Sequence, residues 1–368
     1  MSPDDGVLVV NAGSTSTKLS IIGADGSTTW SCNGEPGVDA FQRALASAGT
    51  ALVGVGAVGH RVVHGGARFT DPVVVDDAVM LELAALADLA PLHNEAGLAA
   101  MRAAREQLPE VPHVACFDTA FHATMPESAR AYGGPHAWLD DGLRRYGFHG
   151  LSHEYASARG AELLGRAVTH VRLVTCHLGG GCSLAAVDRG RSVDTTMGFT
   201  PLDGLVMATR SGSVDPGLLL HLLRNGVTVD DLDETLERRS GLLGLSGVSG
   251  DLREVLAARD AGNERARLAV DVFVHRLVGG IAAMAASLGG VDALVFTGGI
   301  GEHNAEVRRR AADALAWWGV SVDPAANDGA NSGDADVSGR DARVRLLVVE
   351  AREDLVIARS TRSLLASR

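Results

Sequence analysis

The feature that most constrains the fold of this chain is a pattern of strand, glycine-containing turn and strand that occurs twice. The first copy covers residues 7–22 and the second covers residues 172–187. In both copies the predicted strands are short and mostly apolar. When the copies are superposed, His177 falls on Asn11, and a glycine follows two positions later in each. The pattern predicts two similar domains, each with a glycine hairpin that faces a shared nucleotide.

The first turn, Asn11-Ala-Gly-Ser-Thr-Ser-Thr-Lys18, has a composition suited to an anion. Lys18 is the only lysine in the chain. Backbone N–H groups, hydroxyl groups and one ammonium group favour phosphate as the ligand. A Walker A loop would need a Gly-Lys pair followed by a helix, whereas Lys18 follows Thr17 and precedes a strand. The alternative interpretation is a Ser/Thr hairpin turn with an exposed lysine.

The length and charge of the chain limit the classes of function. Its 368 residues are long for one domain and sufficient for two. A formal net charge of −12 argues against a nucleic-acid partner. No apolar run reaches spanning length without interruption, and the acidic start leads directly into a strand, so we expect neither a signal peptide nor a membrane helix. The four cysteines lack metal-ligand spacing. We therefore expect them to be reduced core cysteines in a cytosolic protein.

Further elements are expected from apolar runs, glycines and prolines. Pro91 is expected to end one helix, with residues 92–94 as a break before the next. The expected strands are 58–66, 114–119, 293–297 and 344–349; the expected helices are 77–90, 95–107, 264–288, one that opens at 251–253, one that follows residue 302 and runs to about 318, and a last one that opens at 353; the segment 324–340 is expected to be a loop.

One motif is rejected as a binding site. Residues 54–59 match the pattern G-x-G-x-x-G. A dinucleotide site requires a helix directly after this pattern, so that the helix N-terminus meets the pyrophosphate. The run that follows is of β type, which excludes the dehydrogenase interpretation.

Several polar residues stand where strands or turns end. Asp118 closes an apolar strand, a usual place for a ligand-binding acid in an α/β sheet. His149 lies in a glycine-flanked segment, where a structural histidine is the alternative to a site residue. Arg210 lies in a long segment of low helical period and could hold a phosphate. Arg61, considered alone, is better interpreted as a surface charge at a sheet edge.

The order of these motifs resembles the acetate kinase family. The matching segments occur in family order along nearly the whole chain: Asn11–Lys18, His60–Gly66, Ala90–Asn94, Phe117–His122, Tyr146–Gly150, His177–Gly179, Asp194–Pro201, Thr209–Gly212 and Gly299–Glu302. Each segment is weak evidence alone, but nine in register are a strong signal. The resemblance implies an α/β, duplicated actin-like ATPase fold, related to ribonuclease H, in which the nucleotide lies in the cleft between two similar domains. These domains are expected at 1–122 with 355–368, and at 123–354.

The resemblance also implies a reaction and its participants. Members of the family are homodimers that transfer phosphate reversibly between ATP and a short carboxylate. They use Mg²⁺, for which Mn²⁺ is an alternative, and are expected in the cytoplasm with no membrane or nucleic-acid partner. The implied site residues are Asn11 and Glu353 for the metal; Lys18, His177, Leu178, Gly179, Gly180, Gly181, Asp251, Leu252, Arg253, Gly299, Ile300, Gly301, Glu302 and His303 for the nucleotide; Val63, Leu92, Phe148 and Pro201, with Arg61, for the acid; and Arg61, Asp118, His149 and Arg210 for catalysis.

The sequence departs from the family pattern at three positions. Gly180 stands where family members usually carry asparagine, Ala208 replaces a usual glycine, and His303 replaces a usual asparagine. Gly180 bears on the phosphoryl donor, because a minor branch of the family uses pyrophosphate. The alternatives that stay open are a propionate or other short-chain carboxylate kinase, a pyrophosphate-using acetate kinase, and an actin-like switch ATPase.

Overall fold

The computed structural model describes residues 5–12, 17–86 and 91–367, without the side chains of 91–96. These residues form two compact units. Unit 1 comprises Met1–Ala123, Phe148–Leu151 and Arg352–Arg368, and unit 2 comprises Thr124–Gly147 and Ser152–Ala351. These bounds differ from the expected domains chiefly at Phe148–Leu151, which the structure includes in unit 1.

Unit 1 is built on a six-stranded mixed sheet in the order β3-β2-β1-β4-β6-β5. Its strands are β1 (Gly6–Ala12), β2 (Thr17–Ile22), β3 (Thr28–Gly34), β4 (Val55–Val62), β5 (Val73–Val74) and β6 (His113–Phe117). The hairpin predicted from the first repeat is confirmed, because β1 and β2 pair antiparallel with Asn11 opposite Lys18. The strand expected at 58–66 is found as β4, but it begins earlier, at Val55 within the glycine pattern of residues 54–59, and ends at Val62.

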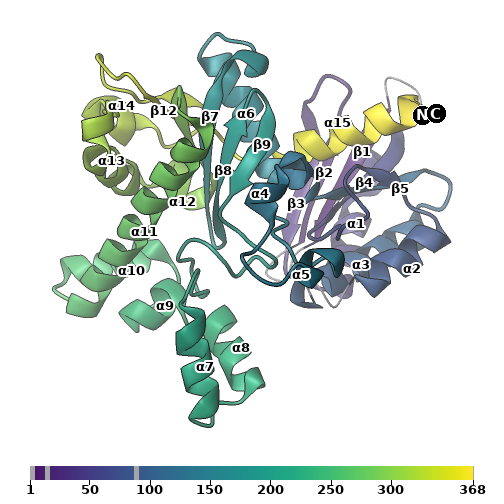
Figure 1. The fold of residues 1–368 in the computed structure, drawn as a ribbon. Helices are drawn as coiled ribbons and strands as arrows, with labels where there is room; N and C mark the ends of the chain where they lie inside the picture. Colours follow the sequence, from purple (N-terminus) through teal and green to yellow (C-terminus); the bar gives the residue numbers. More distant parts are fainter. Residues whose placement is uncertain (1–4, 13–16, 87–90, 368) are drawn as a thin grey trace. The chain divides into compact units, whose positions relative to one another are not determined.

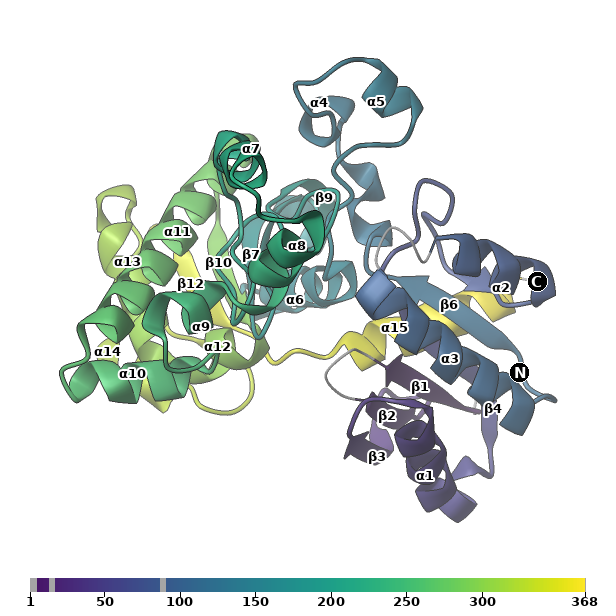
Figure 2. The same cartoon turned by 90° about the horizontal axis from the view of Figure 1, so that it is seen from below.

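Helices cover both faces of this sheet (Figures 1 and 2). They are α1 (Val38–Ala48), α2 (Asp77–Ala85), α3 (Pro91–Gln107) and α15 (Glu353–Ala366). Phe41 of α1 and Ala104 of α3 pack on Leu8 and Val10 of β1. On the opposite face α15 contacts β1 and β4, and the bare Cα of Gly59 makes room for Ile357. The sheet is therefore buried on both faces, which explains its near-continuous apolar strands.

Unit 2 contains a second six-stranded sheet in the order β11-β12-β10-β7-β8-β9. Its strands are β7 (Arg172–Leu178), β8 (Cys182–Asp188), β9 (Arg191–Thr195), β10 (Ala293–Thr297), β11 (Ala335–Asp336) and β12 (Arg345–Val348). Its helices are α4 (Glu127–Arg130), α5 (Ala137–Asp140), α6 (Gly150–Leu163), α7 (Pro216–Arg224), α8 (Val229–Arg238), α9 (Gly241–Ser246), α10 (Leu252–Asp260), α11 (Glu264–Leu288), α12 (Gly298–His303), α13 (Ala305–Ala314) and α14 (Pro324–Gly329).

The two sheets share one topology. In each, the first strand pairs antiparallel with the second, and the second with the third. The first strand also begins a parallel triplet, β1-β4-β6 in unit 1 and β7-β10-β12 in unit 2, with an antiparallel edge strand beyond it. The duplication predicted from two hairpins thus extends to all six strands. In each unit the carboxyl ends of the parallel triplet meet at one edge of the sheet, the usual place for a ligand.

Helix α11 is the long apolar helix expected at 264–288. By length and composition alone it could cross a membrane, with a mean hydropathy of 1.6 in its most apolar window. In unit 2 it packs against β7, β8 and β9, and Phe273, Leu277 and Ile281 are buried there. Its place in the structure is that of a core helix.

Three expectations about helices were wrong. Pro91 does not end a helix: it is the first residue of α3, where proline's missing N–H costs nothing. The helix expected to run to about residue 318 is broken at Asn304, whose side chain accepts a hydrogen bond from Val307 N and starts α13. The loop expected at 324–340 contains α14 and β11. The start of α14 was overlooked in the sequence: Asp323 is its N-cap and Pro324 its first residue.

Candidate functional site

Four polar residues lie together where the parallel strands of unit 1 end. Arg61 is near the end of β4, Asp118 follows β6, Asn11 is near the end of β1 and Glu353 opens α15. Arg61 Nε and Nη2 donate to the Asp118 carboxylate at 2.9 and 2.5 Å. Arg61 Nη1 donates to Asn11 Oδ1 at 3.1 Å, and Asn11 Nδ2 donates to Glu353 Oε2 at 3.2 Å. We call these four residues the Arg61 cluster.

Burial and charge set the electrostatics of the Arg61 cluster. The side chain of Asp118 is 1% exposed and that of Arg61 is 18% exposed. Burial alone would lower the pKa of Arg61, but the carboxylates of Asp118 and Glu353 outweigh it and raise the pKa of the guanidinium. Burial raises the pKa of Asp118, and the adjacent Arg61 opposes that change. Arg61 is therefore a permanently charged cation in a fixed orientation, and the surface-charge interpretation is wrong.

A strained turn fixes the main chain beside Asp118. His149 has a φ of 56°, which is unusual for a residue other than glycine, and its backbone N–H donates to the Asp118 carboxylate. The N–H of Gly150 donates to Asp118 O at 2.9 Å, and a Cβ on Gly150 would overlap that oxygen. Strained residues of this kind cluster at functional sites. His149 thus lies next to the Arg61 cluster, within unit 1.

Two of the four apolar residues expected around the acid lie in unit 1 with described side chains. Val63 and Phe148 are both buried in unit 1, where the Phe148 ring meets His64 edge-on at 5.3 Å. The side chain of Leu92 is outside the described part of the chain. Pro201 belongs to unit 2.

A buried histidine next to this turn was not singled out in the sequence. His122 is completely buried and its Nε2 lies 3.0 Å from Phe148 O. Burial lowers the pKa of His122 to about 4. His60 and His113, whose rings are joined by a 2.9 Å hydrogen bond, also have pKa values lowered by burial. The motif Phe117–His122 was recognised, but nothing in it distinguishes a buried neutral histidine from an exposed one.

We expect these histidines to make stability depend on pH. In the unfolded chain a histidine titrates near pH ~6.5, so between pH 6.5 and about 4 the unfolded state binds more protons and the free energy of unfolding falls as pH falls. For His122 the full loss is about 3 kcal/mol. From pH 7.5 to 5 the melting temperature of wild type should fall more steeply than that of His122→Gln. His136→Gln is the control, because His136 is exposed; equal slopes in wild type and His122→Gln would contradict the prediction.

The turn that first suggested a phosphate site is described only at its ends. Residues 13–16 are outside the described part of the chain. Lys18 is exposed on β2, directly opposite Asn11 of the Arg61 cluster. The register therefore puts the single lysine one strand away from Arg61's partner.

The glycine turn of unit 2 joins β7 to β8. His177 Nδ1 lies 2.8 Å from Ser152 Oγ, Gly179 N donates to Gly181 O, and Gly180 O accepts from Ala208 N. A Cβ on Gly180 would meet no described atom within 4 Å. Packing in unit 2 therefore does not require glycine at this position, and the space beside it could hold a ligand. Leu178, the last residue of β7, is fully buried.

The two other segments assigned to the nucleotide also lie in unit 2. Asp251 caps α10 by accepting from Arg253 N at 2.8 Å, and its carboxylate pairs with the exposed Arg253 side chain. Leu252 is buried. Gly299 and His303 are exposed on α12, whereas Glu302 Oε1 accepts from Ala351 N at 3.1 Å. The remaining residues of this set are Ile300, half-buried, and Gly301, buried.

Arg210 has a partner that sequence inspection missed. Its Nε lies 3.0 Å from Glu237 Oε2, and its Nη1 donates to Pro201 O at 3.4 Å. The side chains of Arg210 and Glu237 are 18% and 14% exposed. Glu237 lies in α8, among acidic residues that are mostly exposed, so its sequence context carries no signal of this role. The pair orients the guanidinium of Arg210 within unit 2.

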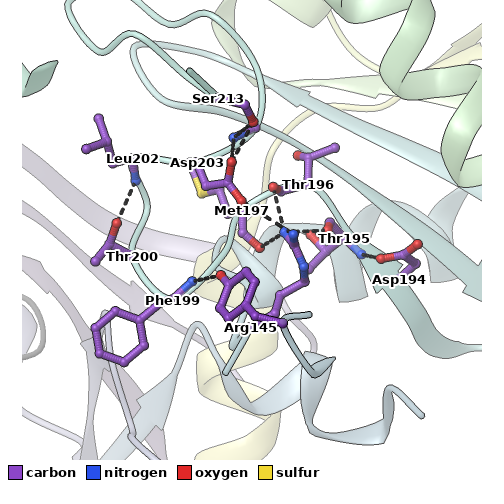
Figure 3. Close-up of polar contacts among 12 residues, drawn as sticks. Arg145, Asp194, Thr195, Thr196, Met197, Phe199, Thr200, Leu202, Asp203 and Ser213 are labelled. Atoms are coloured by element: carbon purple, nitrogen blue, oxygen red, sulfur yellow. Dashed lines mark hydrogen bonds and ion pairs between the residues drawn. The ribbon is translucent and has the colours of Figure 1, made fainter. Parts of the chain in front are cut away.

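The segment that carries Pro201 and Arg210 is held by a cluster that Figure 3 shows around Arg145. Arg145 donates to three successive carbonyl groups, those of residues 195–197, and faces Asp203. Arg145 was not among the expected site residues. Arg145 directly precedes the motif Tyr146–Gly150, and this position in the sequence could have marked it as a candidate site residue.

Comparisons with known proteins agree on one family. Residues 32–359 match the Acetokinase family. The chain is 54% identical over 304 residues to the acetate kinase of Gloeobacter violaceus, which covers 82% of this chain and 75% of that protein. Its structure is similar to that of Porphyromonas gingivalis acetate kinase, with a TM-score of 0.89, 36% identity and coverage of 98% and 100%. It is also similar to a propionate kinase from Francisella tularensis, with a TM-score of 0.90, 35% identity and coverage of 98% and 99%.

These similarities extend over nearly the whole chain and bear on the fold prediction. The α/β class and the duplicated two-domain organisation are confirmed by the two sheets of equal topology. The match to a solved acetate kinase and a solved propionate kinase identifies the architecture as the actin-like ATPase fold.

Proposed function

Because this chain belongs to the acetokinase family, as its motifs predicted, we propose that it transfers the γ-phosphoryl group of ATP reversibly to acetate. The products are acetyl phosphate and ADP. The observation that carries the proposal is the Arg61 cluster at the carboxyl ends of three parallel strands, in a chain 54% identical to an acetate kinase.

The chemistry of the reaction explains the value of such a cluster. The carboxylate of acetate is ionised at pH 7, because such acids titrate near pH ~4 to 5, so no general base is needed. The difficulty is that one anion must attack another. Oriented guanidinium groups stabilise the charge on the transferring phosphoryl group, and each is worth at least ~2 to 4 kcal/mol in the transition state. We assign this work to Arg61, which has His149 next to its cluster in unit 1, and to Arg210 of unit 2.

Asp118 is assigned to hold Arg61 rather than to remove a proton. Both of its oxygens accept hydrogen bonds from Arg61 Nε or Nη2, three in all, and a fourth comes from the backbone N–H of His149. A carboxylate so occupied orients the guanidinium fork in one plane. The edge of the guanidinium that Asp118 does not contact, at Nη1, faces Asn11.

The donor set of the Arg61 cluster fits Mg²⁺. The ion takes oxygen ligands, usually one or two from carboxylates, with waters and substrate phosphates in the other positions. Glu353 offers a carboxylate and Asn11 an amide oxygen, and the two side chains are in hydrogen-bond contact. Among the described residues no group of three acidic, histidine or cysteine side chains could hold a metal. When bound with the nucleotide, the ion supplies positive charge to the phosphate oxygens.

The nucleotide is assigned to Lys18 of unit 1 and to three segments of unit 2, the turn 177–181, residues 251–253 and residues 299–303. The open space beside Gly180 and Gly299 supports a close approach of phosphate or base to the backbone there. ATP is the proposed donor, and pyrophosphate stays the alternative because Gly180 lacks the amide side chain usual in the family.

Val63, Leu92, Phe148 and Pro201 are proposed to receive the methyl group of the acid. Propionate is the second candidate, supported by the similarity to a propionate kinase at 35% identity. One methylene changes binding by only about 1–3 kcal/mol, so both acids can be substrates. Acetate is preferred here because the identity to an acetate kinase is higher. We further propose a homodimer in the cytoplasm, on the strength of the family resemblance.

The test is ADP formation from Mg-ATP with acetate, with propionate, and with neither, and with pyrophosphate in place of ATP. We expect ADP release that depends on a carboxylate, with kcat/KM highest for acetate. ADP release without a carboxylate would favour a switch ATPase. Product formed only with pyrophosphate would mean that pyrophosphate, the alternative suggested by Gly180, is the phosphoryl donor.

A further inference from the structure

The segment that carries Pro201 and Arg210 contacts Arg145 at several points along the main chain. Nη1 of Arg145 donates to the carbonyl oxygens of Thr195, Thr196 and Met197 at 3.2, 2.9 and 2.8 Å. In an extended strand successive residues alternate direction, so three successive carbonyl groups can meet one nitrogen only if the chain curves around it. Figure 3 shows this convergence at the end of β9. The curve depends on the guanidinium, because carbonyl oxygens alone repel one another.

The other side of the same guanidinium closes the neck of the loop that follows. Arg145 Nη2 lies 3.4 Å from Asp203 Oδ2, while Asp203 Oδ1 accepts from Ser213 Oγ at 2.5 Å and from Gly204 N at 2.8 Å. Ser213 N returns a hydrogen bond to Gly204 O. The loop 204–212 is thus tied at its base by Asp203 and Ser213, and Arg210 lies within it.

The crowding at this neck shows that its conformation is specific. Gly204 has a φ of 102° and Gly212 a φ of 68°. A Cβ on Gly204 would come within 2.8 Å of Thr196 O, and one on Gly212 would overlap Leu205 O. The neck therefore packs main chain against the segment that Arg145 holds, and a shift of one moves the other.

A tyrosine completes the support. The Arg145 guanidinium lies 5.8 Å from the centre of the Tyr132 ring, and the Tyr132 hydroxyl accepts a hydrogen bond from Phe199 N at 2.7 Å. Pro201, whose carbonyl oxygen accepts from Arg210, follows two residues later. Arg145 and the ring that it covers therefore support residues 195–203, in addition to the hydrogen bonds that Thr195 and Thr196 make with Leu184 of β8 and those that Gly198 O accepts from the main chain of residues 146 and 147.

From these contacts we propose that Arg145 is a positioning residue: through residues 195–197 and Asp203 it sets the place of Pro201 and Arg210 for phosphoryl transfer. The inference rests on the proposed function. Arg145 is not assigned any contact with substrate. Because a displacement of about 1 Å at a reacting centre can cost ~100-fold in rate, loss of this support should be visible in turnover.

The first test compares Arg145→Gln with Arg144→Gln. Arg144 is the adjacent arginine, and its guanidinium lies over the Tyr146 ring at 5.5 Å. For Arg145→Gln we expect kcat to fall by about 10- to 100-fold and KM for acetate to rise, with KM for ATP unchanged. The double variant with Asp203→Asn should lose less than the product of the single losses, because both act through one contact. Unchanged kcat, or equal losses in the two arginine variants, would overturn the proposal.

The second measurement does not depend on activity. Hydrogen exchange of the amides of 196–213 should become at least 10-fold faster in Arg145→Gln, while the amides of β7 and β10 keep their wild-type rates. Exchange that quickens evenly over unit 2, or stays unchanged, would mean a general structural role or none, and would overturn the proposal. If the wild type shows local protection by Arg145 but no acetate-dependent turnover, the proposed function fails while the positioning of this segment stands.

Discussion

Arg61→Ala is expected to lower kcat for acetyl phosphate formation by about 100- to 1000-fold, because it removes one oriented cation from the transition state. It should also lower the free energy of unfolding by about 3–5 kcal/mol, since the Asp118 carboxylate, 1% exposed, would be left buried without its partner. Turnover with Mg-ATP and acetate measures the first effect. Urea or thermal unfolding of the same preparation measures the second.

Two variants control this prediction. Arg68→Ala removes an arginine that is 71% exposed and pairs with the half-buried Glu82, so stability should change by less than about 0.5 kcal/mol and kcat should not change. Arg61→Lys keeps a charge but cannot form the two-pronged contact with Asp118, and should be intermediate. A wild-type kcat in Arg61→Ala would remove Arg61 from the site.

Asp118→Asn separates orientation of Arg61 from proton removal. We expect kcat to fall at every pH while the shape of its pH profile is preserved, because acetate needs no base. The loss of an ionisation near neutrality in this variant would show that Asp118 acts as a base, against our assignment.

Arg210→Ala is expected to lower kcat by a similar 100- to 1000-fold, but with a small change in stability. The reason for the difference is the exposure of the carboxylate that remains: Glu237 keeps 14% of its side-chain surface, against 1% for Asp118, so water can solvate it. Measured on the same sample, acetyl phosphate formation should therefore fall strongly while the melting temperature changes little. A large loss of both would mean that Arg210 chiefly supports the fold of unit 2.

The ion pair of Arg210 offers its own controls. Glu237→Gln keeps a hydrogen-bond acceptor but removes the charge that orients Arg210, so its kcat should lie between those of wild type and Arg210→Ala. Arg238→Ala, on the same helix, breaks an exposed pair with Glu234 and should leave kcat unchanged. Equal activity in Glu237→Gln and wild type would show that Arg210 is held by other contacts.

The hairpins and the long helix were predictable because their signals are local. The strand–turn–strand of residues 7–22 is encoded by neighbouring apolar residues and a glycine turn. Helix α11 is encoded by a strongly apolar stretch of 25 residues. Helix boundaries were less predictable, because the same residue can end or begin a helix. Pro91 was expected to end one and begins α3, while Asn304 interrupts an expected helix as an N-cap.

The sequence by itself determined the duplicated α/β architecture and the family, since both depend on the order of short motifs along the chain. It also nominated Arg61 and Asp118, but not their contact. The tertiary structure decided which charges meet: Arg61 with Asp118 in unit 1, and Arg210 with Glu237 in unit 2. It also placed Arg145 under the loop that carries Arg210. The physical reason is that an ion pair needs side chains within about 4 Å, and strand pairing and helix packing, rather than nearness in sequence, bring them there.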